Sequence, residues 1–137
     1  MEIVDTLKNG YKIIQNSEMF KFGIDAVLLS YFSFNQIRNN EKIIDLGTGN
    51  GIIPLLLAKS RAKTITGLEI QKENVEIAKK SIALNQLENK INVIQGDIKL
   101  GSKDCPKHSF DSVLTNPPYM INNHGKQNPK DAKIIAR

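Results

Sequence analysis

The sequence predicts an α/β fold in which a parallel β-sheet carries helices on both faces. Short apolar runs typical of buried strands alternate along the chain with stretches of helical periodicity. The first apolar run stops at glycine, which marks the end of a strand. Strands buried on both sides read as continuous apolar runs, and helical crossovers make such strands parallel. We therefore expect right-handed β-α-β units.

The composition fits a single soluble domain. The chain has 137 residues, of which 40% are hydrophobic and 24% charged. Its longest apolar stretch lies within Gly51–Ala58, far short of the roughly 20 residues of a membrane helix, and the acidic N-terminus does not resemble a secretory signal. One cysteine, Cys105, and no Cys/His cluster argue against disulfides and zinc, so we expect a cytoplasmic protein without metal. The net charge of +5 favours an anionic partner.

Residues 41–137 hold the predicted core of the fold. Pro54 falls in the first turn of one predicted helix, where its missing N–H is harmless. The next helix has apolar residues at Val75, Ala78 and Ile82, close to helical spacing. The predicted strands are Glu41–Leu46, Lys63–Ile70, Ile91–Gln95 and Phe110–Thr115, and the predicted helices are Gly51–Ser60 and Lys72–Leu87.

Residues 1–40 form a predicted N-terminal extension to this core. The pair Asn9-Gly10 is a turn signal between apolar residues, which predicts a small hairpin. Asp25–Phe34 is a strongly apolar stretch with an acid near its start, which predicts a helix. At the other end, the chain turns polar after Tyr119, and we expect a loop followed by a helix that begins near Asp131.

A glycine-rich turn follows the first core strand. Glycines at positions 47, 49 and 51 allow a sharp turn and a close approach of a ligand, because no Cβ stands in the way. A nicotinamide-binding fingerprint would place its third glycine where this chain has Ile52. The turn also has an acid, Asp45, two residues before Gly47. A tight strand-to-helix turn and a ligand-binding loop both fit this pattern.

Two more acids stand at the ends of the next two strands. Glu69 could accept hydrogen bonds from both hydroxyls of a ribose. Asp97, after Gly96, could accept a bond from an adenine amino group or could cap a turn. Ligands of open α/β sheets bind outside the carboxyl ends of the strands. Together with Asp45, these acids predict one nucleoside site at that edge.

The fourth core strand runs into Asn116-Pro117-Pro118-Tyr119. Two consecutive prolines fix the backbone and remove two N–H donors. The Asn116 side chain and the carbonyl oxygens are then rigidly placed acceptors, and Tyr119 offers a flat face for stacking. A stiff loop would be the alternative explanation for the tetrapeptide alone.

These motifs together resemble the class I S-adenosylmethionine-dependent methyltransferases that modify planar amino nitrogens, whose sheet is Rossmann-like. The residues in common are the glycine turn Asp45–Gly51, Glu69, Gly96-Asp97 and the tetrapeptide that starts at Asn116. Within these enzymes, Phe20–Leu29 resembles the N-terminal motif of the bacterial family that methylates an adenine amino group in the anticodon loop of a valine tRNA. Lys133–Arg137 also resembles a segment of that family.

The resemblance implies a cofactor and a substrate. The cofactor would be S-adenosylmethionine, with its methionine part against the glycine turn, its ribose on Glu69 and its adenine on Asp97 and Ile98. Phe22 and Gly23 could line the same pocket. Asn116 and Pro117 would accept hydrogen bonds from the target amino group, and Tyr119 would stack on the target base. The substrate would be an adenine in tRNA.

Other functions remain open at this point. A glutamine-amide methyltransferase uses the same tetrapeptide, but it carries a helical domain before the glycine turn. Methylation of guanine in ribosomal RNA or of adenine in DNA also fits, as does a non-catalytic cofactor- or RNA-binding role. The resembling fold has seven strands and this sequence predicts four, so we expect a sheet incomplete at its C-terminal side, with an open edge prone to self-association.

Overall fold

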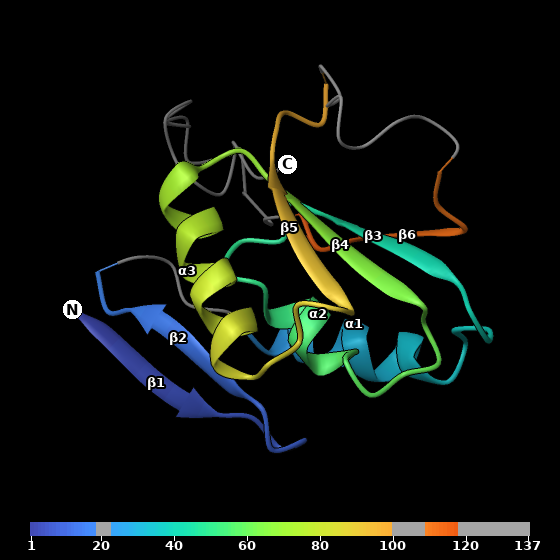
Figure 1. The fold of residues 1–137 in the computed structure, drawn as a ribbon, viewed down its shortest axis with the longest axis horizontal. Helices are drawn as coiled ribbons and strands as arrows, with labels where there is room; N and C mark the ends of the chain where they lie inside the picture. Colours follow the sequence, from blue (N-terminus) through green and yellow to red (C-terminus); the bar gives the residue numbers. More distant parts are fainter. Residues whose placement is uncertain (19–22, 100–108, 118–137) are drawn as a thin grey trace, which may run out of the picture.

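A four-stranded parallel sheet forms the centre of the protein. The structure is a computed structural model and describes residues 1–18, 23–99 and 109–117. The strands are β3 (Lys42–Leu46), β4 (Thr64–Glu69), β5 (Ile91–Gln95) and β6 (Ser112–Thr115), arranged in the order β5-β4-β3-β6 (Figure 1). All neighbours are parallel. The predicted α/β class and its four core strands are therefore confirmed.

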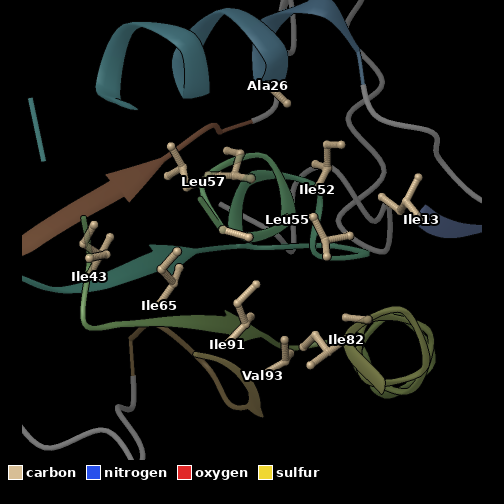
Figure 2. Packing of buried hydrophobic residues seen from close by; sticks show 14 of the residues in the cluster. Ile13, Ala26, Ile43, Ile52, Leu55, Leu57, Ile65, Ile82, Ile91 and Val93 are labelled. Carbon is tan, nitrogen blue, oxygen red and sulfur yellow. The ribbon is translucent and has the colours of Figure 1, made fainter. Parts of the chain in front are cut away.

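Three helices pack on one face of this sheet: α1 (Ile24–Phe34), α2 (Ile52–Leu56) and α3 (Lys72–Leu84). Their buried residues form one hydrophobic cluster with alternate residues of the strands, among them Ile43, Ile65 and Ile91, which lie in register across the sheet. Figure 2 shows Leu55 of α2 and Leu57, its C-cap, among the labelled side chains of this cluster. The described part thus shows helices on one of the two predicted faces, and the helix expected near Asp131 lies outside the described residues.

The N-terminal hairpin is also confirmed. Strands β1 (Glu2–Thr6) and β2 (Lys12–Asn16) pair antiparallel, and Gly10 adopts a positive φ of 91° in the turn. The hairpin docks on α3 through side chains: the Ile14 N–H donates to Ser81 Oγ (2.9 Å), and the Lys12 N–H donates to Asn85 Oδ1 (2.8 Å). It shares the hydrophobic cluster with the sheet through the fully buried Ile13.

Two helices end earlier than their sequence predicts. After α2, the Ala58 N–H bonds to the Leu55 carbonyl and the Ser60 N–H to the Leu57 carbonyl, so the backbone tightens into turns instead of continuing the α-helix. After α3, the Asn85 side chain donates to the Lys12 carbonyl (2.6 Å) and Gln86 takes a left-handed φ of 56°. Local hydrogen bonding therefore stops both helices before their apolar patterns run out.

Candidate functional site

The four strand ends predicted to form a site lie side by side at one edge of the sheet. Leu46 of β3 is in register with Leu68 of β4 and with Thr115 of β6, and Glu69 is in register with Gln95 of β5. The residues that follow therefore line up in spatial order: Asp97, then Glu69, then the glycine turn, then Asn116. Three strand spacings of about 4.8 Å separate the outer two, so the row is about 14 Å long.

Hydrogen bonds to two consecutive residues at the end of β4, Leu68 and Glu69, hold the glycine turn. The N–H groups of Gly47 and Thr48 donate to the Leu68 carbonyl at 2.8 and 3.0 Å, and the Gly49 N–H donates to Glu69 Oε1 at 2.9 Å. Gly47, Gly49 and Gly51 have φ values of 70°, 59° and 88°, a region that side chains with a Cβ rarely adopt. The sharp turn predicted from the glycine spacing is therefore present, and space is open beside Gly49, where a Cβ would meet nothing within 4 Å.

Glu69 is the centre of the hydrogen-bond network at this edge. It exposes 1% of its surface, yet both oxygens are bonded: Oε1 accepts from Gly49, and Oε2 accepts from the Gln71 N–H at 2.9 Å. Asn74 Nδ2 lies 3.5 Å from Oε2. A carboxylate has about four lone-pair sites, so Glu69 keeps the capacity to accept further donors such as ribose hydroxyls.

Asp45 differs from Glu69 in its bonding. It is equally buried at 1% exposure, but neither carboxylate oxygen has a hydrogen-bond partner, and the buried hydroxyl of Thr48 also has none. Burial raises the pKa of Asp45 from 3.8 to about 7; Thr48 acts against that shift and the Glu69 charge adds to it. Although Thr48 influences this pKa, no bond of ordinary geometry joins the two side chains.

Gly67 is a residue of the site that the sequence reasoning missed. It lies on β4 opposite Asp45, and a Cβ built there would stand 2.6 Å from Thr48 Cγ2 and 2.8 Å from Thr48 Cβ. Only glycine lets the turn settle this close to the sheet. The available signal was a glycine inside a strand, which often marks the close approach of another part of the chain, here the Thr48 side chain.

Asp97 and Ile98 follow β5 at one end of the row. The Gly96 N–H donates to the Glu69 carbonyl at 3.0 Å, which ties this strand end to its neighbour. Asp97 accepts the Lys99 N–H at 2.8 Å, so the turn-capping role considered for it is present. Both Asp97 and Ile98 are half-buried.

Asn116 and Pro117 follow β6 at the other end of the row, and both are half-buried. The Thr115 hydroxyl lies 3.4 Å from the Leu46 carbonyl, which holds this strand end beside the start of the glycine turn. Gly23 is exposed at the start of α1, on an element apart from the four strand ends. Phe22 and Tyr119, the other predicted site residues, lie outside the described residues.

Two kinds of feature are absent from the described residues 1–18, 23–99 and 109–117. No group of three or more His, Cys, Asp or Glu side chains is arranged to hold a metal ion there. None of the helices in that part is both long and apolar enough to cross a membrane.

Comparisons with known proteins identify similar sequences and similar folds. The chain is 33% identical over 129 residues to the tRNA1(Val) (adenine(37)-N6)-methyltransferase of Tolumonas auensis, an alignment that covers 93% of this chain and 51% of that protein. It spans about half the length of the curated relatives it matches.

Solved structures share the fold at lower identity. Methanocaldococcus jannaschii Trm5 in complex with adenosine matches 86% of this chain and 35% of its own, with a TM-score of 0.69 and 24% identity. A SAM-dependent methyltransferase from Agrobacterium tumefaciens matches 85% of this chain and 40% of its own, with a TM-score of 0.66 and 20% identity. The family described as the methyltransferase small domain matches residues 17–135, and the chain belongs to that family.

Proposed function

We propose that this chain forms the cofactor-binding half of an enzyme that transfers a methyl group from S-adenosylmethionine to the exocyclic amino nitrogen of an adenine in tRNA. One observation carries the proposal: Asp97, Glu69, the glycine turn and Asn116 stand in this spatial order along one edge of the sheet. An extended nucleoside with an amino-acid end, lying along that row, would reach from the adenine acceptor to the methyl acceptor. The names of the relatives support tRNA as the substrate and, with it, a cytoplasmic location.

The described residues fit S-adenosylmethionine. Asp97 and Ile98 would hold its adenine, and Glu69, with lone pairs left after two backbone bonds, would accept the ribose hydroxyls. The open side of the turn at Gly49 would receive the amino-acid end. Phe22 and Gly23 would line the pocket. When bound, the cofactor supplies a methyl group on a positively charged sulfur, which makes that carbon electrophilic.

Asn116 and Pro117 would prepare the target nitrogen. An adenine amino group is a weak nucleophile, because its lone pair is delocalised into the ring. The Asn116 side chain and the Pro117 carbonyl would accept its two hydrogens and favour a tetrahedral nitrogen whose lone pair faces the methyl group. This stabilisation grows toward the transition state and therefore raises the rate. The target must first leave the base stack, which costs a few kcal/mol, and Tyr119 would stack on it in the pocket.

Exchanging one residue that would act on the target nitrogen and one that would bind the cofactor tests the proposal. The assay uses an enzyme of the same length as the curated relatives that contains this segment. In that enzyme, Asn116→Ala should lower turnover on tRNA about 100-fold, because one fixed transition-state hydrogen bond is lost. Its affinity for S-adenosylhomocysteine should stay within a factor of a few. Glu69→Gln should do the reverse and weaken that affinity by about 1–3 kcal/mol, since a charged acceptor becomes neutral. Calorimetry and labelled methyl transfer measure the two quantities.

The outcome separates the remaining functions. Normal turnover in Asn116→Ala would remove this residue from the chemistry. Cofactor binding without methyl transfer to any nucleic acid or protein amide would favour a non-catalytic binding role. Transfer to a glutamine amide or to guanine, with tRNA adenine unmodified, would keep the chemistry and replace the substrate.

A further inference from the structure

Cations gather at the amino edge of the sheet, opposite the edge that carries the candidate site. β3 begins with Lys42, and a lysine stands immediately before each of the next two strands of the chain, Lys63 before β4 and Lys90 before β5. These three strands are neighbours in the sheet (Figure 1). The amino-edge patch, as we call this surface, consists of Arg38, Lys42, Lys59, Arg61, Lys63 and Lys90.

The connection between α2 and β4 supplies half of the patch. Its cations Lys59, Arg61 and Lys63 are exposed, whereas Ser60 and Ala62 between them each expose 6% of their surface. Four residues span at most about 14 Å, so the three cations lie within that distance of one another along the backbone. The small buried residues anchor this connection, and the cations therefore extend into solvent as a group.

Hydrogen bonds join the other members of the patch to this connection. The Lys63 N–H donates to the Glu41 carbonyl at 2.7 Å, which brings residues 38–42 alongside. On the other side, Lys90 Nζ donates to the Ser60 carbonyl at 2.7 Å. The patch therefore runs from the start of β3 across β4 to the start of β5.

The acids at this edge do not neutralise the patch. Three of them, Glu41, Glu88 and Asp111, stand beside six cations. In the part of the chain that the structure describes, no cation of the patch forms an ion pair, and Glu41 accepts the backbone N–H of Arg38 at 2.7 Å. Burial lowers the pKa of Lys90, because its charge loses water without gaining a carboxylate partner there. The patch thus has unpaired positive charge available to an anion.

The opposite edge has the reverse charge. Asp45, Glu69 and Asp97 stand at the carboxyl ends of the strands, where negative charge disfavours phosphate groups. An RNA that brings one base to that edge needs cations elsewhere to hold its backbone. From Lys42 to Leu46, β3 spans about 13 Å, a length that a few nucleotides cover.

We propose that the amino-edge patch binds the phosphate backbone of the substrate RNA outside the loop that carries the target base. This inference rests on the proposed function, because it takes RNA as the substrate. Phosphate contacts from Lys and Arg supply affinity and orientation without reading the base sequence. The patch therefore lowers the RNA concentration needed for half-maximal turnover and leaves the methyl-transfer step unchanged.

Fluorescence anisotropy with a labelled stem-loop RNA tests the patch in the 137-residue chain. Arg61→Gln combined with Lys63→Gln removes two exposed cations. We expect the RNA affinity to fall about tenfold at 0.15 M potassium chloride, and the slope of log affinity against log salt to become shallower by about 2.

The matched control, Lys79→Gln combined with Lys80→Gln, removes the same charge from exposed positions on α3. The exposed pair that Lys80 makes with Glu2 is also lost, and such pairs contribute little. Because charges beyond a Debye length are screened, this control should change the RNA affinity less than about twofold and keep the salt slope.

Kinetics in an enzyme of the same length as the curated relatives separate RNA binding from chemistry. The Arg61→Gln/Lys63→Gln pair should raise the KM for tRNA about tenfold and keep kcat within a factor of about two, since the reacting atoms lie at the other edge. The affinity for S-adenosylhomocysteine should be unchanged, which also shows that the variant is folded.

The contrary outcomes are distinct. Equal effects of the two pairs would overturn the inference, because RNA affinity would then follow net charge alone. Poly-glutamate that binds as tightly as the RNA, with the same loss in the Arg61→Gln/Lys63→Gln pair, would assign the patch to acidic proteins instead. Both results leave the proposed function intact. Absence of methyl transfer to tRNA, with the stem-loop RNA still held by the patch, would overturn the proposed function while the phosphate-binding assignment stands.

Discussion

The two lateral sides of the sheet, the one toward β5 and the one toward β6, differ in how much of their apolar surface is buried. Toward β5, the residues that meet α3 are sealed: Ile65 and Ala78 expose 0% of their surface and Ile91 exposes 2%. Toward β6, several large apolar residues of α1 are exposed, among them Tyr31 at 82% and Phe32 at 69%. Figure 1 shows α1 and β6 on the same side of the molecule, away from the hairpin and α3.

The cause lies in which residues α1 buries. Its buried residues are the small Ala26, Ser30 and Ser33, whereas Leu29 and Phe34 pack against the hydrophobic cluster and stay partly exposed. The Ser30 hydroxyl donates to the Ala26 carbonyl at 2.8 Å. Small residues let α1 approach α2 closely but remove little apolar area from water. We infer that most of the stabilising burial of apolar area is on the α2–α3 side, whereas the α1–β6 side offers apolar surface for contact with another polypeptide.

Truncating one leucine on each side should give the largest contrast. Leu55 on α2 is fully buried, so Leu55→Ala should lower the free energy of unfolding by about 2–5 kcal/mol through lost burial and the cavity left behind. Urea unfolding measured by circular dichroism gives the value.

Leu28→Ala on α1 is the matched control, because the same atoms are removed from a helical residue that is 58% exposed. Its effect should stay within about 0.5 kcal/mol. Equal losses for both leucines would mean that the α1 face is covered in solution, and the contrast between the two sides would disappear.

The second-largest effect should come from Asp45 and should change with pH. The pKa of this acid is raised to about 7 in the folded chain, against 3.8 ordinarily, so the folded state binds the proton more tightly than the unfolded state does. Stability should therefore fall as pH rises from about 4 to about 7 and stay level above that. Asp45→Asn removes this loss and should stabilise the chain by about 2–4 kcal/mol at pH 8, with little effect near pH 4.

Urea unfolding of both proteins across this pH range checks the expectation. Glu88→Gln, at an exposed acid outside the site, should keep the fall in stability between about pH 4 and pH 7. A destabilised Asp45→Asn at pH 8 would show that the carboxylate has a stabilising partner in solution.

Most of the fold follows from local patterns in the sequence. The prediction matches both bounds of Ile91–Gln95, and the other core strands differ by one or two residues at one or both ends, because continuous apolar runs mark buried strands. The candidate site was equally predictable in outline, since parallel strands bring their carboxyl ends to one edge whatever the details of packing.

What could not be predicted depends on contacts between distant residues. The apolar pattern of α1 identifies a helix but does not tell which side faces inward, because that depends on the width of the gap beside α2. The need for glycine at position 67 arises from Thr48, 19 positions earlier, and becomes visible only when the turn folds onto β4. Likewise, nothing in the sequence shows that the Asp45 carboxylate lacks hydrogen-bond partners, whereas the Glu69 carboxylate accepts two backbone N–H groups.

The smallest expected effect concerns self-association through the α1–β6 side. β6 is the outer strand of the described sheet, and Val113 on it is 59% exposed. A groove lined by Ser33, Ile37 and Leu114, among others, runs between the end of α1 and this strand. An apolar outer strand beside an apolar helix face is a surface that tends to pair with another chain.

We expect the chain to self-associate weakly and Phe32→Lys to weaken the association about tenfold, because a buried aromatic contact is replaced by a charge. Sedimentation velocity over a concentration series measures the change. Val4→Lys is the matched control: Val4 is 54% exposed, but it lies on the hairpin, on the sealed side, so this substitution should leave the association unchanged. If the unchanged chain stays monomeric at every concentration, the exposed face of α1 does not bind a second copy. If Val4→Lys and Phe32→Lys act alike, association follows net charge, and the two sides of the sheet do not differ as contact surfaces.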